Sequence, residues 1–219
     1  MIAETLISNE IIPLRTSDTG EEALSMMNDF YVRHLPIVNN KQLLGLLSED
    51  DILNYDAGEA VGSYSLSMVR PYAHRKDHIY ELLRLLAEYH LTLIPVVDDD
   101  EDYIGVITLE SLLIHFAQTA SFSEPGSILV LEMSKRDYSL AEIARIVESE
   151  NAAILSSFIT TNLESTRLDI TIKINRQNVQ SIIATLERFN YEVKASFNES
   201  DYVGSLQERY DALMSYLNV

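Results

Sequence analysis

The 219-residue chain has no cysteine and no tryptophan, and it contains only 7 glycines and 5 prolines. Without cysteine the chain cannot form a disulfide, offer a thiol nucleophile or hold zinc through sulfur. The low glycine and proline content stands beside 47% apolar residues. This composition predicts a compact protein with a substantial hydrophobic core and argues against a disordered chain.

Long apolar runs and a basic leader are also missing. The apolar runs are a handful of residues long, far below the roughly 20 residues that cross a bilayer. The first residues, MIAETLISNEII, carry an acid at Glu4 and no basic group, unlike a secretory signal peptide. We therefore expect a cytoplasmic protein without a membrane partner.

Basic residues are scarce, since 16 Lys and Arg stand against 34 Asp and Glu for a net charge of −18. A surface this acidic repels phosphate backbones and anionic headgroups, so we expect no nucleic-acid partner. Any nucleotide site in this chain must be built from local cations and backbone N–H groups.

The most informative pattern is a stretch that occurs twice. Residues 33–53 read RHLPIVNNKQLLGLLSEDDIL, and residues 93–113 read LIPVVDDDEDYIGVITLESLL. Pro36 and Pro95 lie 59 residues apart, whereas Gly45 and Gly105 lie 60 apart, so one residue was added in the turn between them. A repeat that stays in phase through two apolar runs and a turn indicates a duplicated supersecondary unit.

Each copy predicts the order β-α-β-β-α. In the first copy we expect a strand at 10–14, a helix opened by a capping box at Thr19 and Glu22, a hairpin at 35–47 and a helix capped by Ser48. In the second copy we expect a strand at 67–72, a helix capped by Asp77, a hairpin at 93–107 and a helix capped by Thr108. The pair is expected to fill residues 1–121, as repeats 1–58 and 59–121, and a polar linker is expected at 122–126.

The pattern changes after the linker. Residues 127–198 predict the order βαββαβ of a ferredoxin-like domain, and 167–174 (RLDITIKI) is the cleanest two-residue alternation in the chain. Residues 199–219 predict a C-terminal amphipathic helix with Leu206, Tyr210, Leu213 and Leu217 at helical spacing. The predicted class is α+β, with one duplicated module followed by a second domain.

The duplicated unit resembles the CBS motif, named after cystathionine β-synthase, whose tandem pairs form one module. The resemblance is carried by the Leu-Pro-Ile-Val and Ile-Pro-Val-Val runs at 35–38 and 94–97, by Gly45 and Gly105, and by segments 48–51 and 108–111. The second domain resembles an ACT domain in its element order. A CBS pair followed by an ACT-like domain is similar to the architecture of acetoin-utilisation accessory proteins.

The CBS resemblance implies binding of an adenosyl ligand, either an adenine nucleotide (AMP, ADP or ATP) or S-adenosylmethionine, with no required cofactor. In the family a Ser/Thr-x-x-Asp segment supplies a carboxylate that accepts hydrogen bonds from the ribose hydroxyls. The first copy keeps Ser48 and Asp51, whereas the second has Thr108 and Ser111 and lacks the acid. We therefore expect one competent site and one impaired or differently used site.

The same resemblance implies which residues work with Asp51. They come from the segment that leads into the second copy and from the residues before the second strand proline. The implied contacts are Ser48, Asp51, Gly62, Ser63, Tyr64, Met68, Thr92, Leu93 and Ile94. A second site would use Arg33, His34, Thr108 and Ser111. Residues 62–64 are equally consistent with an ordinary loop.

Two charged clusters have alternative interpretations. His74, Arg75 and Lys76 form the densest basic cluster, which either meets ligand phosphates or is a solvated loop. The acidic run at 98–102 lacks the spacing and glycine of a calcium loop and occupies a hairpin turn, so no metal site is expected. The sequence also has no phosphate-binding glycine loop and no nucleophile elbow, so no catalytic residue is expected.

These observations favour a non-catalytic regulatory protein, in which a CBS pair senses an adenosyl ligand and an ACT-like domain serves dimerisation or regulation. The family resemblance implies a homodimer, and the regulated protein partner is unknown. The alternative is a structural interaction module whose nucleotide sites are vestigial.

Overall fold

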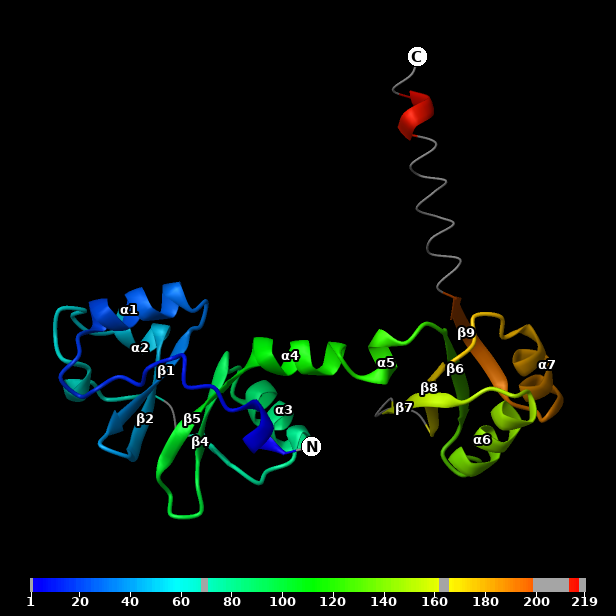
Figure 1. The fold of residues 1–219 in the computed structure, drawn as a ribbon, viewed down its shortest axis with the longest axis horizontal. Coiled ribbons are helices and arrows are strands. Elements are labelled where there is room, and N and C mark those ends of the chain that lie inside the picture. The colour runs from blue at the N-terminus through cyan, green and yellow to red at the C-terminus, as the bar shows by residue number, and fades with distance from the viewer. Residues whose placement is uncertain (1, 68–70, 162–165, 199–212, 217–219) are drawn as a thin grey trace. The chain divides into compact units, whose positions relative to one another are not determined.

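The computed structural model describes residues 2–67, 71–161, 166–198 and 213–216. The chain divides into two compact units, Met1–Phe116 and Ala117–Val219, which are described separately (Figure 1). The first unit holds the two repeats, and the second holds the four-stranded sheet.

The first repeat contains helix α1 (Gly20–Asp29), the hairpin β1 (His34–Asn39) and β2 (Gln42–Ser48), and helix α2 (Glu49–Leu53), after a single-turn helix η1 (Ala3–Leu6). The capping box of Thr19 and Glu22 and the Ser48 cap are both present as predicted, and Ser48 also forms a capping box with Asp51. Each box satisfies backbone N–H groups that the helix itself leaves unpaired.

The second repeat contains a short turn η2 (Val61–Ser63), strand β3 (Ala73–His74), helix α3 (Ile79–Glu88), the hairpin β4 (Leu93–Val97) and β5 (Tyr103–Thr108), and helix α4 (Leu109–Ala117). The duplication extends to backbone detail, because the two hairpins shift register at equivalent positions, Ile37/Val38 and Val96/Val97. The repeat read from the sequence is therefore a repeat in three dimensions.

Each repeat packs the segment that leads into the other repeat. Ser8 exchanges backbone hydrogen bonds with Val106 of β5 at 2.8 and 3.0 Å. The two glycines shared by the repeats make room for these segments: a Cβ at Gly105 would meet Ile7 at 2.5 Å, and one at Gly45 would meet Leu66 at 2.5 Å. Gly105 also has φ +144°, which side-chain-bearing residues rarely adopt.

Three local predictions were wrong. Residues 10–14 make a single parallel bridge, Leu14 to Ile37. The next bond of this ladder would need an N–H from Pro36, which proline lacks. Strand β3 begins at Ala73, after the expected 67–72, of which residues 68–70 lie outside the described residues. Helix α3 is capped by His78, whose ring accepts the Tyr80 N–H.

Asp77 is therefore not the cap of α3. Its carboxylate instead accepts the His74 N–H at 2.8 Å. The same turn occurs in the first repeat, where Asp18 accepts the Arg15 N–H at 2.7 Å. The aspartate stabilises the turn that precedes each helix, and the cap falls to the next residue, Thr19 or His78.

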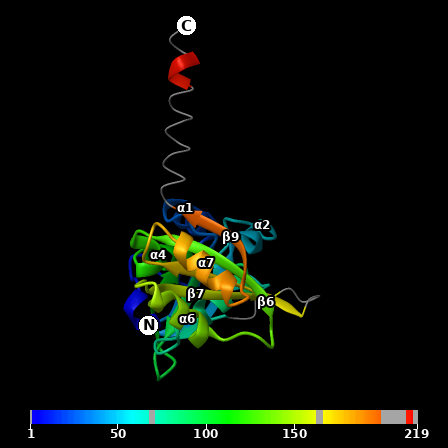
Figure 2. The same ribbon diagram turned by 90° about the vertical axis from the view of Figure 1, so that its right-hand side faces the viewer.

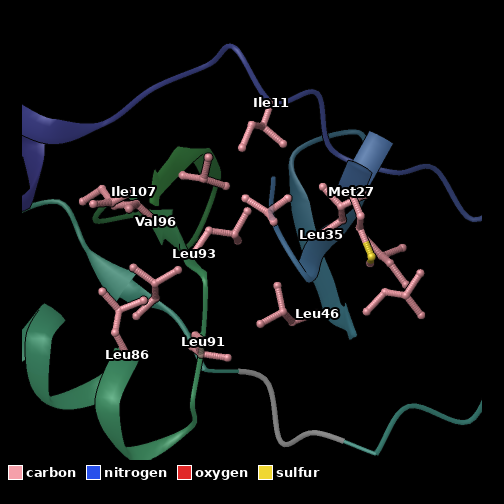
Figure 3. Close-up of a cluster of buried hydrophobic side chains, with 14 of the residues drawn as sticks. Ile11, Met27, Leu35, Leu46, Leu86, Leu91, Leu93, Val96 and Ile107 are labelled. Atoms are coloured by element: carbon pink, nitrogen blue, oxygen red, sulfur yellow. The ribbon is translucent and has the colours of Figure 1, made fainter. Parts of the chain in front are cut away.

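One hydrophobic core serves both repeats. Leu35 and Leu46 of the first hairpin lie in the same buried cluster as Leu93 and Val96 of the second, as Figure 3 shows. Because neither hairpin can bury its apolar face alone, the two repeats stabilise each other as one module.

The second unit has the predicted order βαββαβ. Its elements are β6 (Ser127–Ser134), α6 (Leu140–Ser149), β7 (Ile154–Thr161), β8 (Arg167–Ile174), α7 (Gln180–Arg188) and β9 (Glu192–Asn198), after a short helix α5 (Ala120–Ser123). The strands pair antiparallel in the order β7-β8-β6-β9. Helices α6 and α7 cover one face (Figure 1 and Figure 2). This is the ferredoxin-like arrangement expected of an ACT-like domain.

The boundaries outside the sheet stay largely untested. Helix α5 ends at Ser123 and so overlaps the first two residues of the linker predicted at 122–126. The linker itself remains a prediction. Residues 213–216 are helical, whereas the rest of the C-terminal helix predicted at 199–219 lies outside the described residues.

Two tyrosines of the first unit, Tyr64 and Tyr103, allow the core packing to be tested. The Tyr103 hydroxyl is buried and has no hydrogen-bonding partner among the described residues, whereas the Tyr64 hydroxyl donates to the Asp56 carbonyl at 2.9 Å. We expect Tyr103→Phe to leave the free energy of unfolding unchanged or higher, and Tyr64→Phe to lower it by about 1 kcal/mol. Urea unfolding of both variants checks this, and an equal loss in both would contradict it.

Candidate functional site

A pocket of about 290 Å³ lies between the two repeats of the first unit. Arg33 and His34 at the start of β1, with Ser48 at the end of β2, form one part of its wall. The second repeat and the first turn of α2 complete the lining with Ser67, Tyr89, His90, Glu49 and Asp50. Both repeats therefore contribute residues to the wall of this pocket.

Asp51 lies behind two of these lining residues and is 2% exposed. Its Oδ2 accepts the Ser48 N–H at 3.0 Å and the Ser48 hydroxyl at 2.6 Å. Its Oδ1 accepts the Ser67 N–H at 3.0 Å. One carboxylate therefore connects the start of α2 to the segment that leads into the second repeat.

Asp51 is held as an anion. Burial alone would raise the pKa of this carboxyl, but the hydrogen bonds from Ser48 and Ser67 favour the charged form. These bonds prevail, and the pKa of Asp51 lies below its ordinary value of 3.8. The structure therefore keeps a buried negative charge whose partners line a pocket.

Thr92 joins the two repeats beside this pocket. Its hydroxyl accepts the Arg33 N–H at 2.9 Å and lies 3.0 Å from His34 Nδ1. The Thr92 N–H donates to the same nitrogen at 3.3 Å. Because Nδ1 accepts this bond, the contact suits a neutral imidazole with its proton on Nε2.

The charges around His34 favour the same neutral ring. Burial lowers the pKa of His34, and the nearby Arg33 cation lowers it further, against the opposing effect of Asp50 and Asp51. Arg33 is itself paired, with Nε 2.9 Å from Glu49 and a terminal nitrogen 3.7 Å from Asp50. Arg33 therefore already has carboxylate partners within the protein.

The second repeat reproduces the scaffold of Asp51 without its charge. The Ser111 N–H donates to the Thr108 hydroxyl at 3.0 Å, as the Asp51 N–H does to Ser48 at 3.1 Å. The Ser111 hydroxyl then donates to the Thr108 carbonyl at 2.8 Å. Thr108 therefore caps its helix as Ser48 does, but the second repeat has no carboxylate at position 111.

The predicted contacts of residues 62–64 are engaged elsewhere. The Gly62 N–H donates to the Thr16 carbonyl at 3.0 Å, and a Cβ there would meet that oxygen at 2.6 Å. The Ser63 hydroxyl donates to the Ala60 carbonyl at 2.8 Å. This turn packs the second repeat's leading segment onto the first repeat and does not line the pocket.

The remaining predicted contacts divide between core and undescribed chain. Tyr64 is buried and stacks on Tyr55 with ring centroids 4.7 Å apart. Leu93 and Ile94 are completely buried in the shared core, and Met68 lies outside the described residues. The structure brings together Arg33, His34, Ser48 and Thr92, which the sequence had divided between two sites.

Sequence reasoning missed five of the lining residues, which are Glu49, Asp50, Ser67, Tyr89 and His90. A signal was present, because Tyr89 and His90 lie 59 residues after Phe30 and Tyr31. Both pairs end a helix, and Tyr31 and His90 share a left-handed backbone at φ 54° and 53°. The turn that leads each helix into its strand is thus part of the repeated architecture.

The basic cluster upstream of α3 takes no part in the pocket. Arg75 pairs with Glu4 and Lys76 pairs with Asp99, so both cations have carboxylate partners. Among the described residues no group of three or more His, Asp and Glu side chains is placed to hold a metal ion. Within the same residues no helix has the length and apolar character to cross a membrane.

The role of Asp51 in stability can be tested through pH. Asp51→Ala removes the acceptor of Ser48 and Ser67, and we expect the free energy of unfolding at neutral pH to fall by about 2 kcal/mol. Because the folded pKa is lowered, the unfolded chain takes up the proton first. The difference in the free energy of unfolding between wild type and variant therefore has its full value above pH 3.8, the ordinary pKa of the group, and becomes smaller as the pH falls below it.

Denaturant unfolding between pH 7 and pH 3 measures this difference. Ser111→Ala, at the equivalent uncharged position, serves as the control, and its effect should not vary with pH. A constant Asp51→Ala difference across the whole range would contradict an ionised, hydrogen-bonded Asp51.

Comparison with curated proteins finds relatives that resemble this chain over part of their length. It is 24% identical over 157 residues to inosine-5′-monophosphate dehydrogenase of Methanocaldococcus jannaschii, covering 69% of this chain and 31% of that one. It is 26% identical over 117 residues to homoserine O-acetyltransferase of Methanococcus vannielii, covering 51% of this chain and 24% of that one. The chain thus spans about a quarter to a third of the length of these curated relatives.

Among solved structures, a CBS domain pair/ACT domain protein from Thermotoga maritima is 21% identical, with a TM-score of 0.48, covering 54% of this chain and 98% of that one. The family model of the CBS domain matches residues 3–58 and 62–118, just over half of the chain. The matched ranges correspond to the two repeats that meet around the pocket. The chain therefore belongs to the CBS domain family and carries two of these domains in tandem.

Proposed function

We propose that this protein is a non-catalytic regulator whose CBS pair binds an adenine nucleotide at the pocket beside Asp51. The observation that carries the proposal is the buried Asp51 carboxylate, whose hydrogen-bond partners Ser48 and Ser67 line a pocket between the repeats. An ionised carboxylate accepts strongly from two adjacent hydroxyls, which is what a ribose offers. In this proposal the ribose approaches Asp51 from the pocket, past Ser48 and Ser67.

The charges of the pocket favour a ligand with few phosphates. Arg33 is the only Arg or Lys among the described lining residues, and it faces Glu49 and Asp50. A phosphate that binds Arg33 must replace these carboxylates and enter the field of a chain with net charge −18. We therefore propose AMP as the preferred nucleotide, ahead of ADP and ATP, with S-adenosylmethionine as a separate arm of the test.

Two relatives support a regulatory role over a catalytic one. A match of 157 residues makes up 31% of a dehydrogenase, and a match of 117 residues makes up 24% of an acetyltransferase. Most of each enzyme therefore lies outside the part that resembles this chain, and the two enzymes carry out different reactions.

The second unit completes the proposal as the part that transmits the signal. We propose that the protein is a homodimer and that its ACT-like unit serves dimerisation or regulation of a protein partner. Ligand binding then shifts the balance between two arrangements of the chain, by as much as its affinity differs between them.

A specific observation favours a second candidate function, a structural interaction module with vestigial sites. Ser111 stands where an acid is needed, and both Asp51 oxygens already have partners within the protein. On this alternative Asp51 is a helix cap that stabilises the module and binds nothing.

Isothermal titration calorimetry with AMP, ADP, ATP and S-adenosylmethionine separates the two functions. We expect one AMP per chain, and at least tenfold weaker binding to Asp51→Asn, because a hydrogen bond to a charged group contributes about 1.5–3 kcal/mol. Asp29→Asn at the end of α1 is the matched control and should bind like wild type.

A gain-of-function variant keeps the test independent of folding defects. Ser111→Asp restores the missing acid in the second repeat and should add a second, weaker site. Unchanged AMP affinity in Asp51→Asn would sink the site assignment. Failure of every ligand to bind a folded wild-type protein would favour the interaction module.

A further inference from the structure

A second pocket of the first unit, of about 510 Å³, shares no lining residue with the pocket between the repeats. It lies where two parallel segments diverge. Leu14 pairs in parallel with Ile37 of β1, and beyond this bridge one segment continues into residues 15–17 and the other into residues 38–40. A crevice at the carboxyl ends of parallel strands is a common place for a ligand site. Both segments line the pocket, together with Ile12 and Pro13.

The side chains around this second pocket are donors without a carboxylate. The wall contains no acid, although the chain has 34 Asp and Glu. None of its five polar side chains makes a hydrogen bond or ion pair with any other described residue. Donors that are unused and unaccompanied by carboxylates favour an anion over a cation. These five residues are Arg15, Thr16, Ser17, Asn39 and Asn40.

Arg15 differs from the other cations of the first unit. Its backbone N–H donates to the Asp18 carboxylate at 2.7 Å, but its guanidinium has no carboxylate partner within the described chain. In a protein of net charge −18, such a guanidinium is available to an anion from solution. Every other Lys or Arg that the structure describes in this unit forms an ion pair, namely Arg33, Lys41, Arg75, Lys76 and Arg84.

The second repeat bridges the equivalent space with an ion pair. Ser17 and Asn40 correspond to Lys76 and Asp99, each 59 residues later, which is the spacing of the two strand prolines. Lys76 Nζ lies 2.5 Å from the Asp99 carboxylate, so a salt bridge joins the two segments there. The first repeat has two neutral side chains at these positions. It therefore keeps open a space that the second repeat closes with opposite charges.

The loop that carries Arg15 is held in place by the second repeat's leading segment. The Gly62 N–H donates to the Thr16 carbonyl at 3.0 Å, and the Val61 N–H donates to the Asp18 carbonyl at 2.8 Å. These bonds fix the backbone of the loop before a ligand arrives. Binding at this wall therefore requires little ordering of the main chain, which favours affinity.

We propose that this second pocket binds a small phosphate monoester. The Arg15 guanidinium offers parallel N–H donors to two phosphate oxygens, and the hydroxyls and side-chain amides of the wall can donate to the remaining oxygen. A phosphate presents three acceptor oxygens and a carboxylate only two, so a phosphate engages such a donor set more fully.

The apolar part of the wall describes the rest of the ligand. Ile12 is 68% exposed and lines the pocket with Pro13, so the organic group of the monoester has an apolar surface to cover. The described lining residues include no aromatic side chain on which a nucleobase could stack. The site therefore suits a small non-nucleotide phosphate, and it does not rest on nucleotide binding at the pocket beside Asp51.

Nuclear magnetic resonance titration of the full-length protein tests the proposal, with inorganic phosphate, glycerol 3-phosphate and acetate at constant ionic strength. We expect both phosphates to shift the side-chain amide signals of Asn39 and Asn40 and to saturate them. The backbone amides of Ser67 and His90, in the other pocket, should shift far less. Phosphate shifts confined to Ser67 and His90 would overturn the proposal, and so would acetate binding as tight as that of phosphate.

A matched pair of arginine variants tests the role of Arg15. Arg15→Gln should weaken phosphate binding about tenfold or more, because it removes hydrogen bonds from a charged donor. Arg84→Gln is the control, since it removes the same charge from an arginine of α3 that pairs with Glu81 and Glu88. The control should bind phosphate as wild type does, and equal affinity in the two variants would contradict the site.

A double variant transfers the ion pair of the second repeat to the first. Ser17→Lys combined with Asn40→Asp leaves the net charge at −18, and the new pair should close the pocket. We expect phosphate binding to be lost while the melting temperature stays at or above that of wild type. A folded double variant with wild-type phosphate affinity would overturn the proposal.

Calorimetry with AMP separates this site from the proposed function. AMP binding that shifts Ser67, in a protein that binds neither phosphate probe, overturns the phosphate site alone. Saturable phosphate shifts at Asn39 and Asn40 without any AMP binding support the phosphate site and favour the interaction module over the nucleotide sensor.

Discussion

The first unit depends on one buried carboxylate. Asp51 accepts hydrogen bonds from the Ser48 backbone, the Ser48 hydroxyl and the Ser67 backbone. The first two open helix α2, and the third fixes the segment that leads into the second repeat. Burying a charge is costly unless hydrogen bonds replace the lost water, and here three donors do so. The same residue therefore serves the stability of the pair and, in the proposed function, the recognition of a ribose.

The two repeats share a scaffold and differ in chemistry. Both cap the helix after their hairpin, and both use a glycine to admit the other repeat's leading segment. At the position of Asp51, however, the second repeat has Ser111, which donates to a carbonyl and carries no charge. Where the two repeats meet, the Thr92 hydroxyl contacts the Arg33 N–H and the His34 ring. The pocket thus combines Ser48 of one expected site with Arg33 and His34 of the other, and the Asp51 carboxylate lies behind its wall.

Much of this architecture was predictable from the sequence, because it rests on local rules. The capping box at Thr19, the cap at Ser48, the hairpins and the βαββαβ order all follow from residue types at fixed spacings, and the structure confirms them. Contacts between distant segments were not predictable in this way. The Thr92–His34 contact spans 58 residues and depends on how the repeats face each other. The resemblance implied Tyr64 and residues 62–63 as ligand contacts; they do not line this pocket, and they pack against Tyr55 and Thr16.

The central claim is that Asp51 joins the repeats as an anion and presents that charge to a nucleotide. The most direct test is nuclear magnetic resonance of the Asp51 carboxyl carbon and the Ser67 amide during an AMP titration. Both groups should shift together and saturate at one AMP per chain, while Thr108 and Ser111 shift far less. Saturable binding that leaves the Asp51 and Ser67 signals unmoved would contradict the account.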